Sequence, residues 1–143
     1  MSGIVRDIDS LRPEAQKQAR TWLHVVRQDL QIDARIIETL RTEERQAEVA
    51  AAKASKSLVG WHNVGLAWDF ACFQDGVYQK DDKFGLYKRC GMVGMALGCR
   101  WGGNWDQDTT FMEAGENDLD HLEYHPGFTL QQFLNGQKGG IVP

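Results

Sequence analysis

Two histidines and one aspartate have the types and spacing of a metal site. His62 and Asp69 lie seven positions apart in the segment HNVGLAWD, and His121 follows in DLDHLE. Two imidazoles and a carboxylate can form a catalytic zinc site whose fourth position is open to water. Other divalent ions accept the same ligands, so these residues by themselves indicate a metal rather than zinc. The alternative interpretation is that Asp69 caps a turn and His62 is a surface histidine.

The segment around Asp69 predicts a buried β-strand. From Gly65 onward the chain is apolar and aromatic, and successive side chains of a strand point to opposite faces. Asp69 then shares its face with the small residues Ala67 and Ala71. The other face carries large residues, Leu66, Trp68 and Phe70. A carboxylate in such a strand is costly to bury without a compensating cation or hydrogen bonds, and its small neighbours leave room for a cation.

The candidate general base lies close to His121 in the sequence. Water at a metal site needs a base to take its proton. We predict Asp118 for this role, with Glu123 and Glu116 as alternatives. Residues three apart in a regular strand face opposite ways, so Asp118 can share a site with His121 only from the turn before the strand. Glu123 shares the face of His121 and is also a candidate to hydrogen-bond that ligand.

Two further side chains are candidates for substrate contact. Arg41 stands where a predicted strand meets a helix, and its planar guanidinium could grip a substrate carboxylate there. A solvated surface charge is the alternative. Trp105, in the segment WGGNW, could form the wall of a cleft, or it could belong to the core.

The remaining pattern predicts an α+β domain. Apolar residues recur at helical spacing in three places and at strand spacing in three. Gly91 and Gly94, inside the third helix, predict close approach to a neighbouring element, because glycine otherwise weakens a helix. The predicted helices cover residues 11–30, 42–54 and 84–98, the strands 34–41, 65–73 and 118–125, and a short helix follows within 129–140.

Composition excludes several classes of protein. The chain has 143 residues, 42% of them apolar, which predicts one soluble domain over residues 1–143 without a separate wall-binding module. A net charge of −4 argues against a nucleic-acid partner. The three cysteines have no paired spacing, which indicates reduced thiols. We expect no signal peptide, no membrane insertion and synthesis in the cytoplasm.

These motifs resemble a metallopeptidase family that includes D-Ala-D-Ala carboxypeptidases, vancomycin-resistance D,D-dipeptidases and phage L-alanyl-D-glutamate endopeptidases. HNVGLAWD fits the family motif HxxGxAxD, and DLDHLE fits the second motif, with an acidic residue three before the last histidine. WGGNW is similar to a segment of the phage members, and Thr39 with Arg41 is similar to the T-x-R of the family. The likeness spans about residues 34–125.

The resemblance implies a fold, a cofactor and a function. The fold would be a short antiparallel sheet that carries one zinc ion, flanked by helices, as in the Hedgehog and D,D-peptidase group. His62, Asp69 and His121 would bind Zn²⁺, Asp118 would act as base, and Arg41 would contact substrate. The protein would be a monomeric phage endolysin that cleaves a peptidoglycan stem peptide, most simply at L-Ala–D-Glu. It would reach the wall after release through a holin-type pore.

Two departures from the family and two rival functions remain. The serine usual two residues before the first histidine is Gly60 here, with Ser57 further back, and the segment 105–118 is longer and more acidic. One rival is a D-Ala-D-Ala carboxypeptidase or dipeptidase of the same family. The other is a non-catalytic virion domain with a structural zinc ion, in which His125 or Cys72 would supply the fourth ligand.

Overall fold

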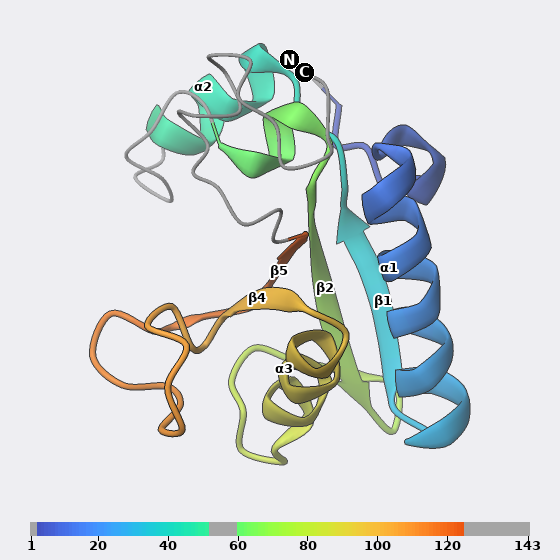
Figure 1. Ribbon diagram of the computed structural model, residues 1–143, viewed down its shortest axis with the longest axis vertical. Helices are drawn as coiled ribbons and strands as arrows, with labels where there is room; N and C mark the ends of the chain where they lie inside the picture. The colour runs from blue at the N-terminus through green and yellow to red at the C-terminus, as the bar shows by residue number, and fades with distance from the viewer. Residues whose placement is uncertain (1–2, 52–59, 125–143) are drawn as a thin grey trace.

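The computed structural model describes residues 3–51 and 60–124, in which helices and strands are interspersed along the chain (Figure 1). The longer helices are α1 (Pro13–His24), α2 (Glu43–Ala51) and α3 (Leu86–Ala96). Shorter helical turns are η1 (Ile8–Ser10), the π-helical η2 (Val25–Asp29) and η3 (Trp61–Val64). The strands are β1 (Asp33–Glu38), β2 (Ala67–Gln74), β3 (Val77–Gln79), β4 (Cys99–Gly102) and β5 (Asp118–Tyr124).

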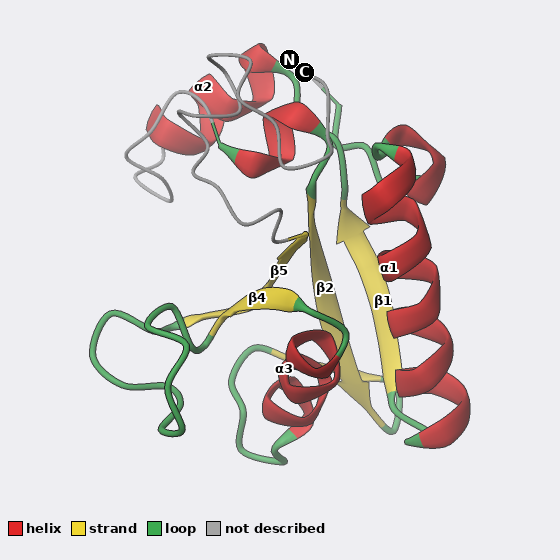
Figure 2. Ribbon diagram, in the orientation of Figure 1, coloured by secondary structure: helices red, strands yellow, loops and turns green. Residues whose placement is uncertain are grey.

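The strands form one antiparallel sheet in the order β1-β2-β5-β4, and β3 pairs with β2 as a hairpin (Figure 2). The register between β2 and β5 places Trp68 opposite Leu122 and Asp69 opposite His121. Residues far apart in the sequence are therefore neighbours at the centre of the sheet. This register decides which side chains meet on each face.

One face of the sheet is covered by α1 and α3. Trp22 of α1 packs on Trp68 and Phe70, and its indole nitrogen donates a hydrogen bond to the carbonyl of Cys90 in α3. Phe70 also lies against Tyr87 of α3. These residues are buried, as predicted for the large side chains of the strand. The opposite face of β2 carries Asp69 and is flanked by α2.

The predicted close approach of α3 is confirmed. A Cβ atom added at Gly91 would overlap the indole of Trp101, and one added at Gly94 would overlap Leu122. The absence of both side chains lets α3 lie directly on β4 and β5. No helix in residues 3–51 and 60–124 is long and apolar enough to cross a membrane.

Several element boundaries differ from the prediction. The first α-helix ends at His24, and the chain continues as a π-helical turn to Asp29. The strand predicted over 34–41 ends at Glu38, where the register with β2 shifts. Strand β4 was not predicted, because CRWGGNW has two glycines and no alternating pattern. The helix predicted within 129–140 lies outside the described residues.

Candidate metal centre

Three elements bring the predicted ligands together. His62 lies in η3, a turn that ends at Gly65 in the left-handed conformation with φ of 72°. A side chain at Gly65 would also press on the backbone of Arg12. Asp69 on β2 and His121 on β5 are paired across the sheet. Ligand atoms of the three residues all lie within 4.8 Å of one another, an arrangement that could hold a metal ion.

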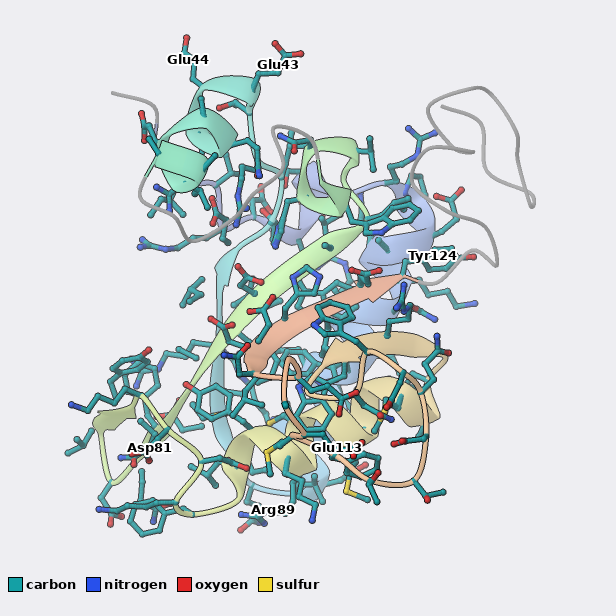
Figure 3. The ribbon with its side chains drawn as sticks, turned by 90° about the vertical axis from the view of Figure 1, so that its left-hand side faces the viewer. Glu43, Glu44, Asp81, Arg89, Glu113 and Tyr124 are labelled. Atoms are coloured by element: carbon teal, nitrogen blue, oxygen red, sulfur yellow. The ribbon has the colours of Figure 1, made fainter. Side chains whose placement is uncertain are left out.

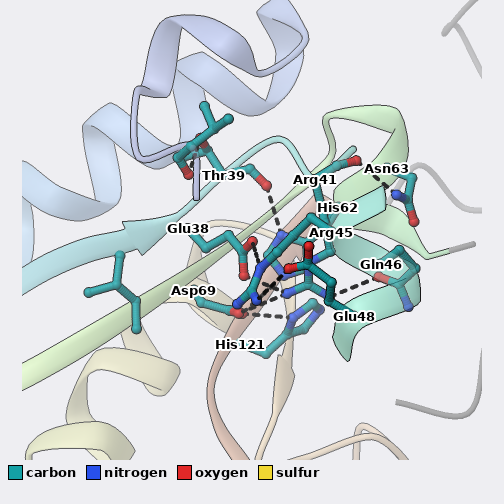
Figure 4. Close-up of polar contacts among 12 residues, drawn as sticks. Glu38, Thr39, Arg41, Arg45, Gln46, Glu48, His62, Asn63, Asp69 and His121 are labelled. Carbon is teal, nitrogen blue, oxygen red and sulfur yellow. Dashed lines mark hydrogen bonds and ion pairs between the residues drawn. The ribbon is translucent and has the colours of Figure 1, made fainter. Parts of the chain in front are cut away.

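The hydrogen bonds of the two imidazoles leave one nitrogen of each directed at Asp69 (Figure 4). Nδ1 of His62 lies 2.8 Å from the carbonyl oxygen of Thr39, and Nε2 of His121 lies 2.8 Å from Oε1 of Glu123. Both partners are acceptors, so these two nitrogens carry the protons. Nε2 of His62 and Nδ1 of His121 each lie 3.1 Å from Oδ1 of Asp69.

This donor set fits a divalent cation. In metal sites a ligating histidine commonly donates its other N–H to a carbonyl or carboxylate, which fixes the ring and increases its basicity. Thr39 and Glu123 provide these two acceptors, and both are buried. Two imidazole lone pairs and a carboxylate oxygen then converge on one point. Positive charge is required there, and a metal ion would supply it.

The pKa values show the same demand for positive charge. Burial raises the pKa of Asp69, but the charge of His62 and hydrogen bonds from His121 and His62 bring it well below its usual range. Burial lowers the pKa of His121, yet its hydrogen bonds to Asp69 and Glu123 raise it well above its ordinary value. A hydrogen bond from an imidazole to Asp69 puts a proton where a metal ion would lie, so the site favours positive charge at that point, and a bound cation would replace the proton.

Arg41 supports the centre from the side of α2. Its Nη2 lies 2.8 Å from Oε1 of Glu38 and 3.5 Å from Oδ2 of Asp69. Nη1 donates to the side chain of Gln46 at 2.9 Å. The backbone N–H of Arg41 also donates to the carbonyl of His62. Arg41 thus ties the turn that carries one ligand to the carboxylate of another.

The three candidate ligands line a cavity of about 490 Å³. Figure 3 looks toward this side of the molecule, where β2 and β5 run beside each other below α2, which is marked by Glu43 and Glu44. Trp105 packs against His121 with ring centroids 5.5 Å apart. The remaining lining residues include Arg45, Gln46, Trp61, Asp118 and Asp120. Trp105 therefore forms part of the wall of the cleft, which was the first of its two predicted roles.

Asp118 reaches this cavity through an irregularity in β5. Trp101 pairs with Leu122, but the next residue of β4, Gly102, pairs with Asp118. The extra residues of β5 break the alternation that would otherwise turn Asp118 away from His121. A Cβ at Gly102 would overlap the carbonyl of Asp118, so glycine permits this pairing. β5 begins at Asp118, as the strand predicted over 118–125 does, so Asp118 shares the cavity with His121 from within the strand and not, as regular alternation required, from the turn before it.

The alternative bases have other positions. Glu123 is buried, is not among the residues that line the cavity, and hydrogen-bonds the ring of His121, which matches its second predicted role. The carboxylate of Glu116 accepts the backbone N–H groups of Asp106 and Glu113 and closes the 103–117 loop. Asp120, which the sequence did not single out, lines the cavity beside Asp118. Strand alternation alone would have grouped Asp120 with Asp118.

Comparison with known proteins gives a family for this arrangement. The profile of the family described as D-alanyl-D-alanine carboxypeptidase matches residues 53–124. The chain belongs to this D-alanyl-D-alanine carboxypeptidase family. The L-alanyl-D-glutamate peptidase of Listeria phage A118 is 31% identical over 111 residues, which are 73% of this chain and 35% of the relative. The chain thus spans about a third of the length of this curated relative.

Two solved structures have the same fold as this family member. The L-Ala D-Glu endopeptidase ChiX of Serratia marcescens aligns with a TM-score of 0.53 and 22% identity, covering 82% of this chain and 92% of that one. The vancomycin resistance D,D-pentapeptidase VanY, solved in complex with Zn(II), aligns with a TM-score of 0.56 and 18% identity. That match covers 80% of this chain and 72% of VanY. The predicted α+β sheet architecture is confirmed.

The remaining candidates in this carboxypeptidase-family chain have different outcomes. Cys72 cannot complete a four-ligand site, because it is buried on the helix-covered face with its sulfur 3.8 Å from that of Cys90. Ser57 and His125 lie outside the described residues. All three cysteines are free, as the sequence indicated.

Proposed function

We propose that this chain is a zinc-dependent peptidoglycan peptidase that hydrolyses the L-Ala–D-Glu bond of the stem peptide. The observation that carries the proposal is the convergence of His62 Nε2, Asp69 Oδ1 and His121 Nδ1 in a cavity that also contains Asp118. The names of the phage relative and of ChiX support the choice of bond. The zinc complex of VanY supports the choice of metal.

His62, Asp69 and His121 would hold the zinc ion. When bound, zinc would supply a Lewis acid for the scissile carbonyl and would lower the pKa of water at the site. Asp118 takes the proton from the attacking water and returns it to the nitrogen of the leaving residue. Trp105 excludes solvent from one side of the ligands, and Arg41 keeps Asp69 in place and faces a carboxylate of the substrate.

Asp120 supports the role of Asp118 as the base. Burial, the charge of Asp69 and a hydrogen bond with Asp118 raise the pKa of Asp120 to about 7. A carboxyl with this pKa holds a proton for part of the time at neutral pH and can donate it in a hydrogen bond to Asp118. This hydrogen bond would hold the side chain of Asp118 in position for its role as the base.

Mass spectrometry of fragments released from purified peptidoglycan tests the function. We expect fragments with a new N-terminal D-Glu, and their disappearance when a chelator is added. Release of D-Ala would instead favour the second candidate, a D-Ala-D-Ala carboxypeptidase, which the family description and the VanY fold suggest. No release from walls of several chemotypes would contradict both and favour a non-catalytic domain.

The phage relative supports a proposal for the biological setting. We propose that the protein acts as a monomer on the bacterial cell wall at lysis, after release through a holin-type pore. Expression in a host with and without a holin tests the release step. Lysis that is independent of the holin would contradict it, and sedimentation would show an oligomer if the monomer proposal were wrong.

A further inference from the structure

Two arginines converge on one buried carboxylate at the α2 end of the cavity. Arg41 Nη2 lies 2.8 Å from Oε1 of Glu38, and Arg45 Nε lies 3.1 Å from Oε2 of the same residue (Figure 4). Both arginines and Glu38 line the cavity that contains the candidate metal ligands. The two guanidinium groups share this one carboxylate, so Glu38 alone does not neutralise both arginines.

The two arginines differ in how much of their hydrogen-bonding capacity is used. Arg41 directs both terminal nitrogens at protein groups, Gln46, Glu38 and Asp69, and its side chain is 11% exposed. Arg45 is 25% exposed, and in the described parts of the chain its Nη2 has no hydrogen-bond partner. Its remaining contact, Nη1 to Glu48 at 3.8 Å, involves a carboxylate that is 37% exposed and competes weakly with a ligand.

Arg45 also lies further from the candidate metal than Arg41. Arg41 contacts Asp69 directly, whereas Arg45 is connected to Asp69 only through Glu38 and Arg41. In an L-Ala–D-Glu substrate the α-carboxylate of D-Glu is two bonds from the scissile nitrogen, so it falls beside the ligands and Arg41. The next residue of the stem peptide extends beyond this carboxylate, which makes its side chain a candidate to reach Arg45.

We propose that Arg45 binds a carboxylate on the third residue of the stem peptide, and so favours meso-diaminopimelate over lysine at that position. The inference rests on the proposed function. Diaminopimelate carries a free side-chain carboxylate that matches the planar fork of a guanidinium. The side chain of lysine ends in an ammonium group, which cannot accept a hydrogen bond from a guanidinium.

Four synthetic peptides, each with the α-carboxyl group of its third residue capped as an amide, test the assignment. They are L-Ala–γ-D-Glu–meso-diaminopimelate with its side-chain carboxylate free, the same peptide with lysine, and both with the D-Glu α-carboxylate amidated. We expect the wild type to have a higher kcat/KM on the diaminopimelate peptide than on the lysine peptide. Arg45→Met should lower kcat/KM on the diaminopimelate peptide about tenfold, at the low end for a charge-assisted hydrogen bond because the site is partly exposed. Arg45→Lys should recover part of the preference.

The controls separate the possible failures. Arg35→Met removes an exposed arginine that is paired with Asp33 on β1, outside the cavity, and should leave the preference intact. If Arg45→Met has the same zinc content and the same urea unfolding midpoint as the wild type, the variant is folded and binds its metal. A wild type that cleaves none of the peptides would overturn the proposed function. An Arg45→Met enzyme that keeps its preference for diaminopimelate, or loses only discrimination against amidated D-Glu, would overturn this inference alone.

Discussion

Glu123 should control how tightly the centre holds zinc, although it does not touch the ion site. Its Oε1 accepts the N–H of His121 at 2.8 Å, and the residue is 3% exposed. Loss of such a supporting acceptor typically weakens metal binding about 10- to 100-fold, or roughly 1.4 to 2.7 kcal/mol. This hydrogen bond is buried, and Glu123→Ala would leave the N–H of His121 without its acceptor. We therefore expect the zinc affinity of this variant to be about 100-fold lower, at the upper end of the range.

Glu123→Gln gives a graded comparison. The amide oxygen still accepts the N–H of His121 but carries no charge, so the ring stays in place and becomes a weaker ligand. We expect a loss of about tenfold, the lower end of the same range. The charge of Arg100, whose Nη1 lies 3.9 Å from Oε2 of Glu123, also loses its partner in this variant.

Zinc dissociation constants measured by competition with a chromophoric chelator provide the assay. Urea unfolding of the chelated proteins separates weaker binding from a damaged fold. Asp69→Ala, which removes a ligand, sets the scale for loss of the site. If Glu123→Ala binds zinc within about twofold of the wild type, the supporting role of its carboxylate is refuted.

Three other predictions concern the base, the core and the thiols. Asp118→Asn should retain zinc and lower kcat by about 10²- to 10⁴-fold in the peptidoglycan assay, and loss of zinc would contradict its role as a base. Gly91→Ala should lower the free energy of unfolding in urea by about 1–3 kcal/mol, because the new methyl group overlaps the buried Trp101. Alanine favours helices over glycine, so unchanged or increased stability would disprove that overlap. Burial and the charge of Glu123 raise the pKa of the Cys99 thiol from 9.0 to about 12 in the folded protein. The protonated thiol therefore stabilises the fold fully below pH 9, and this contribution is lost as the pH rises toward 12. The unfolding free energy should therefore fall between about pH 9 and about pH 12, and it should fall less in Cys99→Ala.

Residue types and motif spacing predicted the residues of the centre, and strand periodicity predicted the face on which Asp69 lies. Alternation in β2 places Asp69 opposite the face of Trp68 and Phe70, and this arrangement is confirmed. Gly91 and Gly94 predicted close helix packing for a similar reason: glycine inside a helix needs a tertiary explanation. These inferences depend on the identity and spacing of a few neighbours in the chain.

Other features depended on contacts that the sequence does not encode locally. The shift of register between β4 and β5 brings Asp118 into the cavity, whereas regular strand geometry would have turned it away. Strand β4 itself was missed, because its residues lack alternation and are held by pairing with β5. The end of the first α-helix at His24 was also missed, since the apolar spacing continues into the π-helical turn.

The sequence alone determined that His62, Asp69 and His121 are ligand types, and that the chain folds as an α+β domain. Only the tertiary structure decided which nitrogen of each ring is available, because Thr39 lies 23 residues from His62 and its carbonyl oxygen meets that ring through folding. It also decided that Arg45 retains an unpaired terminal nitrogen while Arg41 does not. Hydrogen-bond partners depend on register and on the packing of distant segments, whereas residue types and periodicity are local.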